Sequence, residues 1–135
     1  MELRFALNGQ CPSGKNAVVV TRSGHRFPSK RFVKWREDAL QQLYPQIKTM
    51  VDSKLSLLPL KAPVNIKIEY TAKDKIRRDA PGIIDAIWHL LEKAKIIADD
   101  TFLAGWGKKL TFRNCGVDKS KPGLTISITE EDVEC

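Results

Sequence analysis

Residues 64–95, VNIKIEYTAKDKIRRDAPGIIDAIWHLLEKAK, decide the fold because their periodicity changes partway along the stretch. The first nine residues alternate apolar and polar side chains, as a half-buried strand does. From Pro81 to Lys95 the apolar residues recur at the 3.6-residue period of an amphipathic helix, and a proline is common in the first turn of a helix. The sequence therefore predicts a strand, a charged loop and a helix in succession.

The rest of the chain completes an α+β domain with a mixed sheet. Short apolar runs bounded by turn residues indicate strands, and a run with helical spacing indicates a first helix that Pro45 is expected to kink or end. The predicted elements are strands in 3–7 and 17–21, a helix in 29–47, and two last strands within 105–113 and 123–130, joined by a loop at 114–122. The predicted order is ββαβαββ, with two main helices.

Composition places the chain among ordinary single domains. It has 135 residues, 42% hydrophobic and 29% charged, with no internal repeat and no apolar run long enough to span a membrane. We expect one domain over residues 1–129, a short acidic tail at 130–135, and a cytoplasmic location. The three cysteines are widely spaced and form no C-x-x-C pair, which argues against a zinc site or a disulfide framework.

The distribution of charge points toward an anionic partner. The net charge is +7, but four of the 16 acids lie in the last six residues, so residues 1–129 carry 23 bases against 12 acids. Residues 15–36 hold seven Lys or Arg and no acid, interleaved with Phe27, Phe32 and Trp35. This pattern is typical of a phosphate-binding surface, and a solvated basic face explains it equally well.

Acidic residues interrupt this basic background around the second predicted helix. Asp79 precedes the helix, and Asp99 and Asp100 follow it. Enzymes that hydrolyse phosphodiesters with metal ions use clustered carboxylates to bind Mg²⁺ or Mn²⁺. The alternative is that Asp79 is a helix N-cap and that Asp99 and Asp100 are turn residues without a metal. The spacing alone does not separate the two interpretations.

The stretch VNIKIEYTAKDKIRRD, followed by a helix and then IIADD, resembles the RusA family of phage and bacterial Holliday-junction resolvases. The turn NGQCPSGKN at 8–16 and the segment RFPSKRFVKWRED at 26–38 are also similar to that family. The resemblance covers most of the chain and is most specific over residues 64–100. It implies a homodimeric, Mg²⁺-dependent endonuclease, of phage or prophage origin, that resolves four-way DNA junctions by paired nicks in recombination and repair.

Two positions depart from the family pattern Asp-x-Asp-Asn-x-x-Lys. Pro81 stands where the family has its middle aspartate, and Asp85 stands where it has a lysine associated with catalysis. Pro81 and Asp85 are four residues apart, hence one turn apart on the same helix face. Asp85 is therefore either a relocated ligand, a solvated surface acid, or a sign that the site is degenerate.

The resemblance and the charges together give the predicted site. Asp79, Asp85 and Asp100 are the predicted catalytic residues, and the predicted ligands for Mg²⁺ or Mn²⁺ are these three together with Asp99. The predicted DNA-binding residues are Lys15, Arg22, Arg26, Lys30, Arg31, Lys34, Lys73, Lys75, Arg77 and Arg78. Any of the last four could supply the missing cation.

Two rival functions remain open at this point. The first is a DNA-structural protein that binds junctions without cleaving them. The second is binding of RNA or single strands through Phe27, Phe32 and Trp35, whose positions suit helix packing as well as base stacking.

Overall fold

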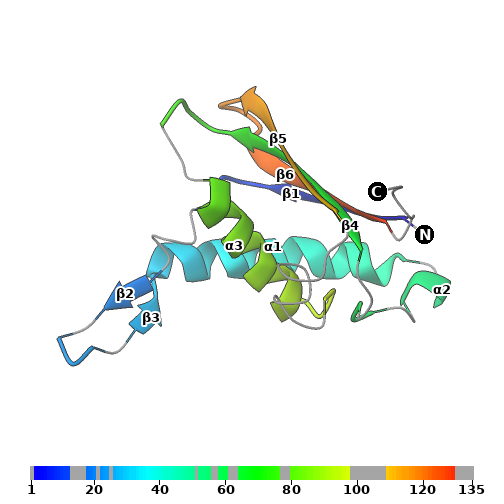
Figure 1. The fold of residues 1–135 in the computed structure, drawn as a ribbon, viewed down its shortest axis with the longest axis horizontal. Helices are drawn as coiled ribbons and strands as arrows, with labels where there is room; N and C mark the ends of the chain where they lie inside the picture. Colours follow the sequence, from blue (N-terminus) through cyan, green and yellow to red (C-terminus); the bar gives the residue numbers. More distant parts are fainter. Residues whose placement is uncertain are drawn as a thin grey trace.

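The computed structural model describes residues 2–12, 18–20, 22–24, 26–50, 52–55, 58–60, 64–76, 80–97 and 109–129. It has an α+β fold in which a four-stranded mixed sheet carries two main helices on one face (Figure 1). The strands are β1 (Glu2–Asn8), β4 (Asn65–Ala72), β5 (Lys109–Val117) and β6 (Gly123–Thr129). The helices are α1 (Lys30–Lys48) and α3 (Ala80–Lys93), and a single helical turn, α2 (Asp52–Leu55), follows α1.

The sheet order is β1-β6-β4-β5. Strand β6 pairs antiparallel with both β1 and β4, whereas β5 runs parallel to β4. A parallel pair needs a crossover connection between its strands, and α3 lies in that connection. The predicted strand–loop–helix stretch is therefore the unit that sets the direction of β5, and the strand and helix predicted there are confirmed.

The core lies between the sheet and the two helices. Alternate residues of β1 and β6 are buried, as their sequence alternation requires. Helix α3 contributes an apolar face on which Ile83, Ile87, Leu90 and Leu91 are at most 1% exposed. Each such side chain stabilises the fold by roughly 1.5–3 kcal/mol relative to its exposure to water.

The predicted chain order ββαβαββ is wrong for the sheet, in which the sheet strands and main helices follow the order βαβαββ. The predicted second strand forms as β2 (Val18–Val20), but it pairs with β3 (Arg26–Pro28) in a separate antiparallel hairpin. This hairpin extends away from the body of the molecule (Figure 1). The predicted loop at 114–122 is also shorter than expected, because β5 continues to Val117.

Two glutamines explain why β2 does not join the sheet beside β1. Gln46 accepts a hydrogen bond from the Ala6 N–H at 2.9 Å and donates to the Ala6 carbonyl at 2.7 Å. Gln42 makes the same pair of contacts with Asn8, at 2.6 and 3.1 Å. These side chains satisfy backbone groups that an edge strand leaves free, so β1 needs no further strand there.

The same contacts keep α1 intact across Pro45. The prediction that Pro45 could end the helix is wrong, because α1 continues to Lys48. A proline removes one backbone hydrogen bond from the helix interior. Gln42 and Gln46 hold the turns on either side of Pro45 against β1, and the buried Leu43 packs into the core.

Candidate nucleic-acid interface and metal-binding residues

The start of α1 carries cations where a helix does not favour them. Ser29 caps the helix, its Oγ accepting a hydrogen bond from the Phe32 N–H at 3.1 Å. The first turn contains no acid, whereas Lys30, Arg31 and the following Lys34 are exposed. The partial positive charge at a helix N-terminus disfavours each nearby cation by roughly 0.3–1 kcal/mol. Their position therefore costs helix stability, which an anion bound at this end of α1 would offset.

A hollow of about 610 Å³ lies beside these cations. Arg31, Lys34 and Asp38 line it from α1, and the turn after β1 lines it on the other side. The full lining is Asn8, Gly9, Gln10, Arg31, Lys34, Trp35, Asp38, Gln41 and Gln42. Two cations with several amide groups suit a phosphate backbone, whose oxygens accept hydrogen bonds.

Gln10 connects this hollow to the loop that follows β4. Its Nε2 donates to the Tyr70 hydroxyl at 2.6 Å, and its Oε1 accepts from the Lys73 N–H at 2.8 Å. The side chains of Lys73 and Lys75 on this loop are exposed. The candidate interface thus extends from the start of α1 to the loop before α3. Gln10 and Asp38 were not among the residues predicted from sequence, and the only signal for Gln10 was its place in a turn resembling the family's.

The predicted DNA-binding residues that the structure describes are exposed: Arg22, Lys30, Arg31, Lys34, Lys73 and Lys75. Lys15, Arg77, Arg78 and the side chain of Arg26 lie outside the described residues. The β2–β3 hairpin, the start of α1, the start of α3 and the loop after β4 all lie toward one end of the molecule (Figure 1). The fold therefore brings together basic segments that are far apart in the sequence.

Of the predicted catalytic and metal-binding residues, only Asp85 lies within the described part of the chain. Asp79 immediately precedes the first residue of α3, and Asp99 and Asp100 follow Ile97; all three lie outside the described residues. Among the described residues alone, no three His, Cys, Asp or Glu side chains are close enough to hold a metal ion. A site with three such ligands therefore needs at least one residue outside the described part of the chain, and Asp79, Asp99 and Asp100 are the predicted ones.

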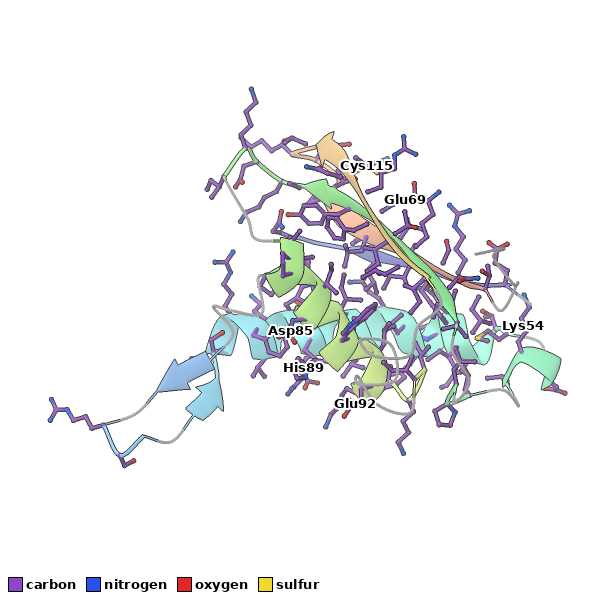
Figure 2. All side chains as sticks on the ribbon, in the orientation of Figure 1. Lys54, Glu69, Asp85, His89, Glu92 and Cys115 are labelled. Carbon is purple, nitrogen blue, oxygen red and sulfur yellow. The ribbon has the colours of Figure 1, made fainter. Side chains whose placement is uncertain are left out.

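Asp85 lies on the outward face of α3 (Figure 2). Its Oδ1 is 3.7 Å from Nε2 of His89, one turn later, and both side chains are 54% exposed. The His89 ring meets the Phe32 ring edge-on, with 6.3 Å between centroids. Asp85 is thus exposed on the side of α3 that faces the start of α1, and its carboxylate is free of any packed core environment.

Two aromatic residues of the basic segment pack inward. Phe32 is 5% and Trp35 is 9% exposed, and their ring centroids are 6.0 Å apart. Arg36 lies over the Phe32 ring, 5.7 Å from its centroid. These contacts assign Phe32 and Trp35 to the core, which removes two of the three aromatics from the base-stacking interpretation. The side chain of Phe27 lies outside the described residues.

No model of a protein family matches the chain, and no curated protein matches it. In the part of the chain that the structure describes, no helix is both long and apolar enough to cross a membrane.

Proposed function

We propose that this protein is a metal-dependent endonuclease that binds branched DNA, as its resemblance to the RusA family implies. The observation that carries the proposal is the gathering of exposed cations at the end of the molecule where α3 begins, directly after Asp79. Phosphate contacts from Lys and Arg supply most of the affinity for DNA. A carboxylate site beside such a surface would lie next to a bound phosphodiester.

Asp79 and Asp100 would hold Mg²⁺ or Mn²⁺, with Asp99 and Asp85 as further ligands. A divalent ion held by these carboxylates would supply activation of water for attack and would stabilise charge on the phosphate oxygens. The chain's own cations hold and orient the strand: Arg31 and Lys34 from α1, and Lys73 and Lys75 from the loop. Asp85 can take the place of the carboxylate lost at Pro81, because the two positions lie one turn apart on the exposed side of α3.

The proposed metal site requires a particular path of the chain after α3. Helix α3 rises about 16 Å between Ala80 and Leu91, at ~1.5 Å per residue. The chain then reverses at Lys95, which has a φ of 60°, and the Ile97 N–H lies 3.4 Å from the Leu91 carbonyl. Asp100 is three residues further, a span of at most ~11 Å. Asp79 and Asp100 can share an ion only if the chain continues back toward the start of α3.

Nicking of a synthetic four-way junction, with and without Mg²⁺ or Mn²⁺, tests the proposal. We expect metal-dependent nicks that Asp79→Asn and Asp100→Asn abolish while junction binding survives. A protein that binds junctions but never nicks them would instead be a DNA-structural module. The departures at Pro81 and Asp85 are the observations that favour this second function.

Paired nicks require two active sites, so we propose that the working form is a two-fold dimer. Light scattering of the full chain, free and with junction DNA, measures its mass directly. A monomer under both conditions would contradict this part of the proposal.

A further inference from the structure

Exposed apolar side chains meet at the loop between β4 and α3. Ile76 on this loop is 68% exposed, and Val117 at the end of β5 is 50% exposed. Both line one hollow of about 370 Å³, together with Tyr70 and Lys75. Four large apolar side chains are exposed in the described part of the chain, and two of them lie here. A single exposed apolar side chain is ordinary, whereas two at one hollow suggest a contact surface.

Hydrogen bonds brace the loop that carries Ile76. The Ile76 N–H donates to Asp74 Oδ1 at 3.0 Å, which closes a local turn. At the other end of the loop, the Lys73 N–H donates to Gln10, which is itself bonded to the Tyr70 hydroxyl. The loop extends past the end of the sheet (Figure 1). The Ile76 side chain is thus held exposed to solvent by a loop that hydrogen bonds fix in place.

Both signs of charge lie beside this apolar spot, since the lining of the hollow includes Lys75 and the Asp74 carboxylate that accepts from the Ile76 N–H. Lys73 is also exposed on this loop, and the sequence continues with Arg77 and Arg78. These cations suit a partner that offers negative charge and apolar area together. Nucleic acid does so with phosphates and base faces, and an anionic lipid surface does so with headgroups and acyl chains. The link through Gln10 to the hollow beside α1 favours nucleic acid, because a concave cationic hollow suits a strand better than a flat membrane.

We propose that Ile76, supported by Val117, packs against the base-pair face exposed at a DNA branch point, while Lys73 and Lys75 hold the flanking phosphates. In linear duplex each base pair is covered by its neighbours, and an apolar side chain enters only after a step is unstacked. At a branch point that cost is lower, because base pairs there lack a neighbour on one side. The inference rests on the proposed function and adds a way in which the protein distinguishes branched from linear DNA.

The test compares the affinity of the full-length protein for a four-way junction and for a linear duplex of the same sequence. Both Kd values are measured in EDTA, so that no cleavage occurs. Ile76→Ser should lower the preference for the junction about tenfold, the effect expected from losing a buried isoleucine contact, while affinity for the duplex stays the same. Ile76→Leu should keep the preference.

Leu110→Ser is the matched control, since Leu110 is 45% exposed on β5 and pairs with Ile66 at the opposite end of β4 from the loop. It should leave both affinities unchanged. A 2-aminopurine base at the branch point provides a second readout. Its fluorescence should rise when the protein binds and unstacks it, and Ile76→Ser should remove that rise. Because Ile76 is exposed, its replacement should not change the thermal midpoint of unfolding.

An unchanged junction preference in Ile76→Ser, in a protein that still binds DNA, would overturn this inference and leave the proposed function standing. Failure of the unaltered protein to bind either DNA would overturn both. Binding to vesicles of anionic lipid that Ile76→Ser abolishes, without any change in DNA preference, would assign the apolar spot to a membrane surface.

Discussion

The size of the loss of nicking activity on replacing Asp85 by asparagine distinguishes a metal ligand from a surface acid. Asp85 and His89 are each 54% exposed and 3.7 Å apart, one helical turn from each other. An exposed pair at this spacing contributes at most ~0.5 kcal/mol to the free energy of unfolding. A ligand contributes several kcal/mol to stabilising the transition state. Because each ~1.4 kcal/mol changes the rate tenfold, a loss of about 3 kcal/mol slows cleavage on the order of 100-fold.

Initial rates of junction nicking with Mg²⁺ and with Mn²⁺ measure this effect, alongside chemical unfolding of the same preparations. We expect Asp85→Asn to slow nicking on the order of 100-fold, as Asp79→Asn does, with nearly unchanged stability. Junction binding in EDTA should survive or tighten, because the substitution removes an anion from a basic surface. Glu92→Gln is the control, since it removes a negative charge from an exposed position on the same helix.

Pro81→Asp provides the reverse experiment. Pro81 is exposed in the first turn of α3, four residues before Asp85. An aspartate there should restore nicking to the Asp85→Asn protein if both positions reach the same ion. Nearly normal nicking by Asp85→Asn alone would refute the reasoning, and Asp85 would then be a solvated acid paired with His89.

Three further outcomes follow from the structure. Affinity for DNA should fall steeply as the salt concentration rises, and the double variant Arg31→Ala/Lys34→Ala should reduce the slope of log K against log salt by about 2. A flat salt dependence in the unaltered protein would exclude phosphate binding. Gln46→Ala should lower the free energy of unfolding by about 1–2 kcal/mol, because it removes two hydrogen bonds between α1 and the Ala6 backbone on β1, whereas Gln41→Ala on the same helix should have little effect. The Asp118 carboxylate accepts hydrogen bonds from the Ser120 hydroxyl and from backbone N–H groups, which lowers its pKa from the ordinary 3.8. The stabilising effect of this carboxylate on the fold is therefore present above pH 3.8 and is lost as the pH falls below that value. The stability difference between the unaltered protein and Asp118→Ala should therefore shrink on acidification, and a difference that grows would contradict this assignment.

Local sequence patterns predicted where strands and helices form better than they predicted which strands pair. The alternation in β4 and the apolar stripe of α3 are local signals, and both elements form where they were expected. The sheet strand order depends on pairing between strands that are distant in sequence, such as β1 with β6. A three-residue strand such as β2 carries no signal for which edge it joins. Its pairing with β3 could not be read from the apolar run alone.

In the candidate site, too, local features could be predicted from sequence and long-range contacts could not. The exposed position of Asp85 follows from the 3.6-residue period of α3, whose buried apolar residues lie on another face. The burial of Phe32 and Trp35 could not be decided from sequence, because aromatic residues in a basic segment suit stacking and packing equally. The bridge from Gln10 to Tyr70 and Lys73 joins residues about 60 positions apart, and no local pattern indicates it.

Several features of the molecule that lower its stability lie toward one end. Lys30 and Arg31 occupy the first turn of α1 against the helix dipole, with no acid to offset them. The first turn of α3 also lacks an acid, and Ile76 exposes apolar area to water just before it. By contrast, Gln46 and Gln42 hydrogen-bond the backbone groups of Ala6 and Asn8 on the edge strand β1. Sites that bind partners commonly retain such unfavourable features, because their groups are stabilised only in the complex. This contrast supports placing the proposed DNA-binding surface at the end where α1 and α3 begin.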